Sequence, residues 1–286
     1  MNNYIQLTEL KNQNFYQGYI MKIIKLNPVT NGLRHQLNIK KSLLSKNNRL
    51  LRNTIKGISY SYGRSSCTGH ITSWHRGGGA KNIFRKIEFS NAGYNSIVVT
   101  NLYDPCRSAF ISLNFDLENL CFFRVLAANT VFPGTLTSCN VNIEDLKLGY
   151  RTQIKNIPTG SIVNNLTIDS KSTSQYIRSA GTYGQIIQTD QLTAKIRLPS
   201  NTIIKVSTEG FASIGVISNL KHNSTCLGKA GRNRLLGRRP IVRGIAMNPV
   251  DHPHGGRSNG GRPSVTPWGL PTKSGFYLKK RKKRNG

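Results

Sequence analysis

The residues with the most catalytic potential form the motif Asp251-His252-Pro253-His254. Two histidines beside a carboxylate can bind a metal ion or transfer protons near neutral pH. Metal-ion catalysis on RNA usually needs several carboxylates, however, and Asp251 is the only acidic residue after Glu209. The serine and cysteine residues lack any motif that would supply an activating base. The other adjacent acid pairs lie in predicted turns: Asp116 with Glu118, and Glu144 with Asp145. We therefore expect no enzymatic activity.

A second candidate for chemistry is the run of three glycines at 77–79, between Arg76 and Lys81. Glycine lets a backbone approach a phosphate closely and leaves exposed N–H groups as donors. The run is not a Walker-type phosphate-binding loop, because Asn82 follows Lys81 where that motif has serine or threonine. The pattern predicts a basic loop that contacts RNA.

Three residues near this loop, Cys67, His70 and His75, have a loosely zinc-like spacing. A structural zinc site needs four ligands, and the sequence offers no fourth candidate nearby. We therefore favour an RNA-contacting loop here over a metal site. No cofactor is expected, although magnesium bound to the RNA itself would be compatible with this interpretation.

The composition indicates a polyanionic partner. The 286 residues include 41 lysine and arginine residues against 11 aspartate and glutamate residues, a formal net charge of +30. Such an excess destabilises a compact chain through self-repulsion, and binding to phosphates relieves the repulsion while releasing counterions. The charge argues against an ordinary soluble enzyme with a small-molecule substrate and for a nucleic-acid-binding protein.

A membrane surface is the other polyanion to consider. No run of about 18 or more apolar residues is present, so no segment is expected to span a bilayer. The N-terminus, with Glu9, Lys11 and Lys22, lacks the charged-then-apolar order of a secretory signal. We expect a nucleic acid, and no membrane, as the partner.

The cysteines and the overall residue usage bear on the compartment. The cysteines are widely spaced and odd in number, which indicates reduced thiols of an intracellular protein. They are Cys67, Cys106, Cys121, Cys139 and Cys226. Asparagine, isoleucine, lysine, serine, tyrosine and phenylalanine are favoured, and these residues share AT-rich codons. The usage predicts an AT-biased genome, a mitochondrial one first, with a plastid or a bacterium as alternatives.

The elements that must position the candidate residues are short β-strands. Apolar or β-branched runs recur with turn residues between them: 96–103, 108–114 and 121–127 in a first group, and 161–168, 184–188, 192–198, 202–207 and 211–218 in a second. Strands this short, separated by turns about every 8–12 residues, predict two small antiparallel barrels. No long helical periodicity is present.

Irregular basic extensions flank the two predicted barrels. The N-terminal extension is expected to contain one short basic helix at 43–51. The C-terminal extension is rich in proline and glycine, which prevents a long helix or a regular sheet. Such a segment lacks its own core and is expected to become ordered against RNA. The predicted domains are residues 1–60 and 221–286 for the extensions, with 61–147 and 148–220 for the barrels.

Several motifs resemble those of one known family. The segment Met247-Asn248-Pro249-Val250-Asp251-His252-Pro253-His254-Gly255-Gly256, followed by Val265-Thr266-Pro267-Trp268-Gly269, looks like the signature of ribosomal protein L2. That family is the universal RNA-binding protein of the large subunit. Further matches occur in the family's order: the loop from His75 to Lys81, Asp104-Pro105-Cys106-Arg107-Ser108-Ala109, Ile177-Arg178-Ser179-Ala180-Gly181-Thr182-Tyr183, and Leu227-Gly228-Lys229-Ala230-Gly231. The loop after Gly256 is shorter than in the family pattern, and residues 1–60 match weakly.

The resemblance implies a mainly β chain: an oligonucleotide-binding (OB) fold barrel, then a Src-homology-3-like barrel, with long irregular basic extensions embedded in rRNA. It implies a structural constituent of the large ribosomal subunit, here of the mitochondrial ribosome. This constituent would bind and stabilise large-subunit rRNA near the peptidyl-transferase region, and so support subunit assembly, subunit association and translation. Its partners would be large-subunit rRNA, neighbouring ribosomal proteins and, at an intersubunit bridge, small-subunit rRNA. Another basic architectural protein that binds nucleic acid is the alternative.

The residues expected to bind RNA combine cations, the glycine loop and the C-terminal extension. They are Arg64, Arg76, Gly77, Gly78, Gly79, Lys81, Arg107, Arg178, Lys229, Arg232, Arg234, Arg238, Arg239, Arg243, His252, His254, Arg257, Arg262, Trp268 and Lys273. Arg107 and Arg178 match arginines with which the family contacts rRNA. His252 matches a histidine that has been considered for a part in peptidyl transfer.

Two of these residues have a structural alternative. Trp268, like Trp74, could stack on an unpaired base, or it could pack into a small core with Pro267 and Pro271. His252 could contact RNA directly, or it could act as a hydrogen-bonded lock on its own loop.

Overall fold

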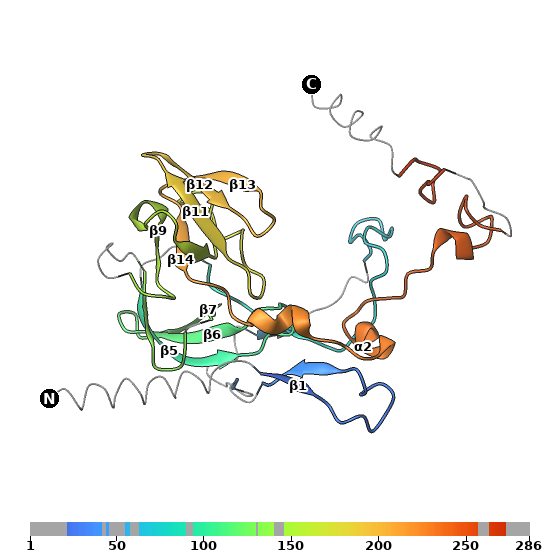
Figure 1. Cartoon of the computed structure of the whole chain (residues 1–286), viewed down its shortest axis with the longest axis horizontal. Helices are drawn as coiled ribbons and strands as arrows, with labels where there is room; N and C mark the ends of the chain where they lie inside the picture. The colour runs from blue at the N-terminus through green and yellow to red at the C-terminus, as the bar shows by residue number, and fades with distance from the viewer. Residues whose placement is uncertain are drawn as a thin grey trace. The chain divides into compact units, whose positions relative to one another are not determined.

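The computed structural model describes residues 22–41, 44–45, 55–57, 63–89, 94–129, 131–139, 146–256 and 263–272 (Figure 1). Backbone packing divides the chain into two compact units. The larger unit comprises Met1–Ser59 with Ala80–Asn233, and the smaller comprises Tyr60–Gly79 with Arg234–Gly286. The helix predicted at 43–51 lies almost entirely outside the described residues.

The strands found in the described residues are short and belong to the larger unit. They are β1 (Ile23–Lys25), β2 (Leu37–Ile39), β3 (Ile55–Gly57), β4 (Ile83–Arg85), β5 (Asn95–Leu102), β6 (Ile111–Asp116), β7 (Phe122–Leu126), β8 (Leu136–Ser138), β9 (Arg151–Gln153), β10 (Ile162–Asn164), β11 (Gly184–Thr189), β12 (Thr193–Arg197), β13 (Ile203–Ser207) and β14 (Phe211–Ile214). The helical segments are the 3-10 turns η3 (Ile154–Asn156), η4 (Leu220–Ser224) and η5 (Gly244–Ala246), and the α-helix α2 (Ala230–Leu235). In the part of the chain that the structure describes, no helix has the length and apolarity needed to cross a membrane.

The first of the two larger sheets is antiparallel, with strand order β7-β6-β5-β8. Side chains alternate between its two faces, so that Leu102, Ile111 and Leu113 pack together on the buried face. Ile217, which follows β14 in sequence, completes this cluster. Burying each such side chain contributes about 1.5–3 kcal/mol.

The second large sheet is also antiparallel, with strand order β13-β12-β11-β10-β14-β9. Its core contains Val163, Ile186, Ile196 and Val206, which are almost completely buried. The sheet curls on itself in Figure 1, as a small barrel requires. The fold class predicted from the sequence is therefore confirmed: the chain is mainly β, with two successive antiparallel sheets.

Two of the predicted strands end earlier than the sequence pattern suggested. The strand predicted at 161–168 stops at Asn164, because Asn165 has a left-handed backbone with φ 51°. The strand predicted at 211–218 stops at Ile214, because Gly215 has φ 105°. A left-handed residue turns the chain out of the extended conformation, so the ladder cannot continue through it.

The two sheets meet around a small polar cavity of about 30 Å³, which has room for ordered water but for no larger ligand. Tyr94, Asn114 and Arg151 line it. Arg151 donates to the Asn165 carbonyl oxygen at 3.0 Å and to the Ser174 hydroxyl at 2.8 Å. Burial raises the pKa of the Tyr94 phenol and lowers the pKa of the Arg151 guanidinium. The cavity lining and the hydrogen bonds of Arg151 therefore connect the two sheets and serve the fold.

Candidate nucleic-acid interface

The predicted cationic side chains are accessible wherever the structure describes them. Each is partly or fully exposed: Arg64, Arg76, Lys81, Arg107, Arg178, Lys229, Arg232, Arg234, Arg238, Arg239 and Arg243. Exposed guanidinium and ammonium groups are the donors that position a protein on a phosphate backbone. The predicted contacts Arg257, Arg262 and Lys273 lie outside the described residues.

The glycine run 77–79, in the smaller unit, joins two segments of the chain. The Gly77 N–H donates to the Gly237 carbonyl oxygen at 3.0 Å. A Cβ atom at Gly79 would lie 3.0 Å from the Gly237 nitrogen, closer than side chains normally pack against a backbone. The Gly77 N–H is therefore used within the chain and is not an exposed donor, whereas RNA binding by the glycine run stays a prediction. Glycine is required here by the close approach of two backbones.

The same contact brings cations together in a surface that we call the basic seam, formed by His75, Arg76, Arg238 and Arg239. Arg76 forms an antiparallel bridge with Arg238, and the Arg239 N–H donates to the His75 carbonyl oxygen at 2.9 Å. All four side chains are exposed. Two segments that are far apart in sequence thus present one basic surface that neither could form alone.

The two tryptophans of the chain, Trp74 and Trp268, contact each other in the smaller unit. Their ring centroids lie 5.8 Å apart with an interplanar angle of 59°. Each residue still keeps more than half of its surface exposed, 55% for Trp74 and 65% for Trp268. Trp74 is a partner that neither sequence alternative for Trp268 included. The pair leaves ring surface free for stacking on a base.

His252 is buried, with 7% of its surface exposed. Its Nδ1 accepts the His254 N–H at 3.0 Å. Its ring also packs on Gly244 so closely that a Cβ there would lie 2.6–2.7 Å from three ring atoms. His254 is half-buried, and its Nε2 lies 2.9 Å from the Pro263 carbonyl oxygen. Of the two alternatives for His252, the structure favours the lock on its own loop.

A methyl group at Gly244 should release this lock. Gly244→Ala would force the His252 ring out of its site, so the His254 N–H would lose its acceptor. We expect the His254 amide to exchange at least about tenfold faster in a hydrogen–deuterium exchange experiment. Gly231→Ala is the matched control, because nothing lies within 4 Å of a Cβ there and no acceleration is expected. Unchanged exchange in Gly244→Ala would contradict the lock.

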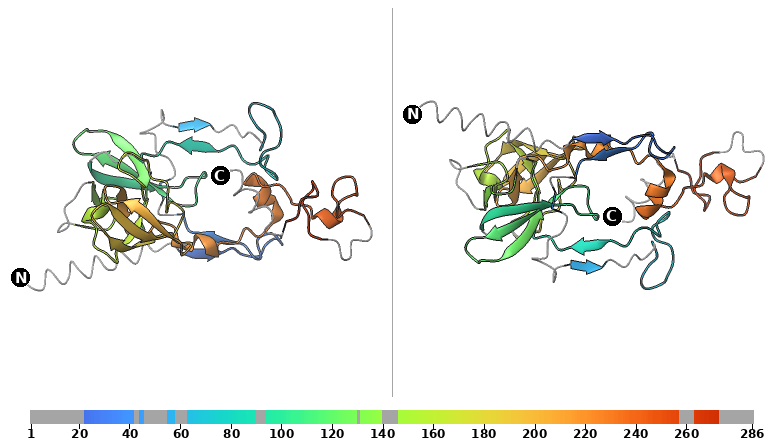
Figure 2. Two further views of the ribbon diagram at one scale, coloured as in Figure 1. Left: turned by 90° about the horizontal axis from the view of Figure 1, so that it is seen from above. Right: turned by 90° about the horizontal axis from the view of Figure 1, so that it is seen from below.

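The C-terminal arm, which we define as residues 226–256, starts on the β1–β2 hairpin of the larger unit. Leu37 and Cys226 exchange two backbone hydrogen bonds, each of 3.1 Å. Both views in Figure 2 show the segment after η4 beside this hairpin. Gly228 follows with φ 77°, and a Cβ there would lie 2.5 Å from the Gly32 carbonyl oxygen. A glycine is therefore needed where the arm leaves the hairpin.

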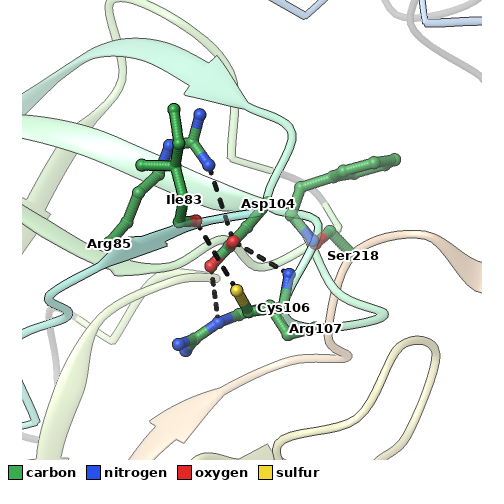
Figure 3. A network of polar contacts seen from close by, with 7 residues as sticks. Ile83, Arg85, Asp104, Cys106, Arg107 and Ser218 are labelled. Carbon is green, nitrogen blue, oxygen red and sulfur yellow. Dashed lines mark hydrogen bonds and ion pairs between the residues drawn. The ribbon is translucent and has the colours of Figure 1, made fainter. Parts of the chain in front are cut away.

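A buried carboxylate holds Arg107 in the larger unit (Figure 3). Asp104 is fully buried, and its Oδ2 lies 2.8 Å from the Arg107 Nε. Its Oδ1 accepts the Cys106 N–H at 3.1 Å and lies 3.6 Å from the Arg85 Nη1. Sequence reasoning selected Arg107 but missed Asp104 and Arg85. The signal for Asp104 was hidden, because an aspartate before a proline also marks a turn.

The thiol beside this carboxylate is kept in its neutral form. Burial, and after it the negative charge of Asp104, raises the pKa of the Cys106 thiol. The Cys106 Sγ–H donates to the Ile83 carbonyl oxygen at 3.5 Å. None of the five cysteines forms a disulfide bond with another, which agrees with the reduced thiols that the sequence predicted.

Arg178, the other arginine matched to the family, lies in the loop before β11. Its guanidinium carbon is 5.2 Å from the centre of the Phe89 ring, a distance typical of a cation–π contact. Phe89 packs against the core of the first sheet. Arg178 is therefore anchored on one side while its side chain remains exposed.

Metal ligands are not gathered in the described part of the chain. No group of three or more histidine, cysteine, aspartate or glutamate side chains there could hold a metal ion. Cys67, His70 and His75 are each exposed and form no such group.

Comparison with known proteins gives consistent matches along the chain. Residues 50–136 match the family described as Ribosomal Proteins L2, RNA binding N-terminal domain, and residues 147–269 match Ribosomal Proteins L2, C-terminal domain. The large ribosomal subunit protein uL2m of Reclinomonas americana is 41% identical over 268 residues, which cover 92% of this chain and 95% of that protein. The large ribosomal subunit protein uL2 of Rickettsia felis is 42% identical over 277 residues, which cover 92% of this chain and 100% of that protein. The corresponding protein of Rickettsia massiliae is 41% identical with the same coverage.

Proposed function

The chain belongs to the ribosomal protein L2 family, and we propose on that basis that it is a structural constituent of the large ribosomal subunit. In this role it binds and stabilises large-subunit rRNA near the peptidyl-transferase region. It thereby supports subunit assembly, subunit association and translation. The relatives are ribosomal structural proteins, and we propose no catalytic role.

The observation that carries this proposal is the basic surface itself. The predicted RNA-binding cations that the structure describes are partly or fully exposed in both units, and the arm contains a single acid, Asp251. In the basic seam, arginines from two segments stand next to each other, which costs electrostatic energy unless an anion lies between them. A phosphate backbone is the anion whose repeated charges fit a surface of this extent.

The exposed tryptophan pair and the buried histidine fit the same role. Trp74 and Trp268 offer an aromatic surface, and single-stranded RNA is bound by stacking of unpaired bases on such surfaces. His252 contributes by fixing the shape of the arm that meets the RNA. Any magnesium would be held by the RNA, and the chain itself needs no cofactor.

The partners follow from this placement in the subunit. We propose neighbouring ribosomal proteins and, at an intersubunit bridge, small-subunit rRNA as further contacts, with no membrane and no small-molecule substrate. We propose the mitochondrial ribosome as the location, because the uL2m relative and the AT-rich residue usage both favour it. Bacterial relatives are equally similar, so fractionation of the source cells decides between the compartments.

Sedimentation tests the function directly. The chain expressed in its source cells should sediment with the large ribosomal subunit, and ribonuclease treatment should release it. The alternative, a basic architectural protein, predicts retention on duplex DNA after the same nuclease treatment. Failure to sediment with large-subunit rRNA at all would overturn the proposal.

Arg178→Ala should weaken binding to large-subunit rRNA without unfolding the second sheet. Loss of one phosphate contact lowers the slope of log K against log salt by about 0.7–0.9. Because Arg178 is exposed, the melting temperature should change little. Filter binding across a series of potassium chloride concentrations measures the slope. An unchanged slope would remove Arg178 from the phosphate contacts.

A further inference from the structure

We propose that Asp104 is a positioning residue, which holds Arg107 and Arg85 in the orientation that receives an RNA phosphate (Figure 3). The inference rests on the proposed function, because it concerns how the chain grips RNA. It adds a buried acid to a surface that otherwise acts through its cations. Sequence reasoning did not include Asp104 or Arg85 among the contacts.

The Asp104 carboxylate is held in place by its surroundings. Asp104 is fully buried, near the start of the loop that follows β5. Its Oδ1 is fixed by the Cys106 N–H at 3.1 Å, from the same turn. A fixed carboxylate gives a fixed direction to the groups that pair with it.

The Asp104 carboxylate contacts Arg107 at one end of its guanidinium group. The ion pair joins Asp104 Oδ2 to the Arg107 Nε at 2.8 Å. The side chain of Arg107 is 21% exposed. A guanidinium carries its donors in a rigid planar fork, so fixing Nε also fixes the direction of both terminal nitrogens. Those nitrogens are the ones that bind a phosphate in a bidentate pair.

The local charge around Asp104 stays positive. One carboxylate is shared by two guanidinium groups, because Arg85 Nη1 lies 3.6 Å from Asp104 Oδ1. The group of three therefore keeps one net positive charge after internal pairing. Asp104 thus orders the two arginines without cancelling the charge that attracts RNA.

Simple electrostatics and the positioning role predict opposite signs for the same substitution. Asp104→Asn removes a negative charge from a protein that binds a polyanion, so charge alone predicts tighter binding. If Asp104 orients Arg107, the substitution frees the Arg107 guanidinium. The Arg107 side chain must then become ordered when RNA binds, and this ordering costs free energy. We expect Asp104→Asn to bind about fivefold more weakly, with a salt slope lower by about 0.7–0.9.

The probe is large-subunit rRNA transcribed from the genome that encodes this chain, titrated with the full-length protein by filter binding. Asp190→Asn is the matched control, because it makes the same charge change at an exposed acid that contacts Gln188 and no arginine. This control should bind as tightly as the wild type or slightly more tightly. Asp104→Asn binding as tightly as Asp190→Asn, with an unchanged slope, would overturn the positioning role.

A second variant covers the case in which Asp104→Asn does not fold. Arg107→Lys keeps both the charge and the buried acid, but a lysine cannot offer the planar fork. It should weaken binding by about three- to fivefold, whereas Arg197→Lys on an exposed face of β12 should not. Equal binding by Arg107→Lys and wild type would overturn the proposal. If the wild-type chain itself bound no rRNA, the proposed function would fail instead, so the two failures are distinguishable.

Discussion

Replacing Arg238, Arg239 and Arg243 together by glutamine should weaken binding to large-subunit rRNA by about 100- to 1,000-fold near 0.1 M monovalent salt. All three side chains are exposed on the arm, whose only acid is Asp251. Each phosphate contact releases about 0.7–0.9 counterions, so three lost contacts lower the salt slope by about two to three. The effect is the largest we expect from surface residues, because three adjacent contacts are lost at once.

The control for this triple variant must change the charge equally. Lys171, Arg197 and Lys205 are exposed cations outside the predicted contact set, and glutamine at these three positions also removes three charges. A general charge effect would weaken both triple variants alike, whereas contact by the arm predicts a much larger loss in the first. Filter-binding titrations at several salt concentrations measure both quantities. Equal losses in the two variants would contradict a specific role for the arm.

Gly228→Ala should detach the start of the arm from the β1–β2 hairpin. A Cβ at Gly228 would lie 2.5 Å from the Gly32 carbonyl oxygen and 3.0 Å from the Gln36 Cβ, and φ is 77°. Backbone atoms cannot swing aside as a flexible side chain could, so the arm itself must shift. We expect a loss of about 3 kcal/mol from the free energy that holds the arm on the hairpin.

Hydrogen exchange at two amides reports this loss. The Leu37 and Cys226 N–H groups bond across the contact, so they should exchange about 100-fold faster in Gly228→Ala. Gly160→Ala separates the clash from the backbone strain, because Gly160 has φ 86° but nothing within 4 Å of a Cβ. The control should leave both amides protected. Rapid exchange in the control as well would mean that a left-handed alanine destabilises the whole fold, and that the effect does not depend on the contact with Gly32.

The sequence predicted the fold class because alternation of apolar and polar residues is a local signal. In β12, for example, Ala194 and Ile196 are buried while Thr193 and Arg197 are exposed. Strand ends were less predictable, because the left-handed residues Asn165 and Gly215 look no different from other loop residues in one sequence. The domain boundaries at 60, 147 and 220 remain predictions.

Helix α2 shows a different limit of sequence reasoning. The basic segment after Lys221 was expected to lack regular structure, yet Ala230–Leu235 forms a short helix. None of its residues is buried, so it carries no apolar periodicity from which it could have been recognised. The intrinsic helix propensity of its residues is then the remaining signal in the sequence, and over six residues that signal is weak.

The candidate interface was predictable in its composition and unpredictable in its contacts. Exposed arginines can be chosen from charge alone, and those that the structure describes are exposed. The contact partner of a residue cannot be predicted from one sequence when the two residues are far apart in the chain. Gly77 was expected to face a phosphate and instead donates to Gly237, and His252 was placed among the contacts although its ring is buried on Gly244.

The basic seam also sets an order of events during synthesis of the chain. His75 and Arg76 leave the translating ribosome long before Arg238 and Arg239, since the residues of both large sheets are made in between. Domains generally fold as they emerge from the ribosome. Both sheets can therefore fold before Arg238 and Arg239 are synthesised and can pair with His75 and Arg76. A nascent chain halted before Gly237 would therefore carry a finished β-rich body but no seam.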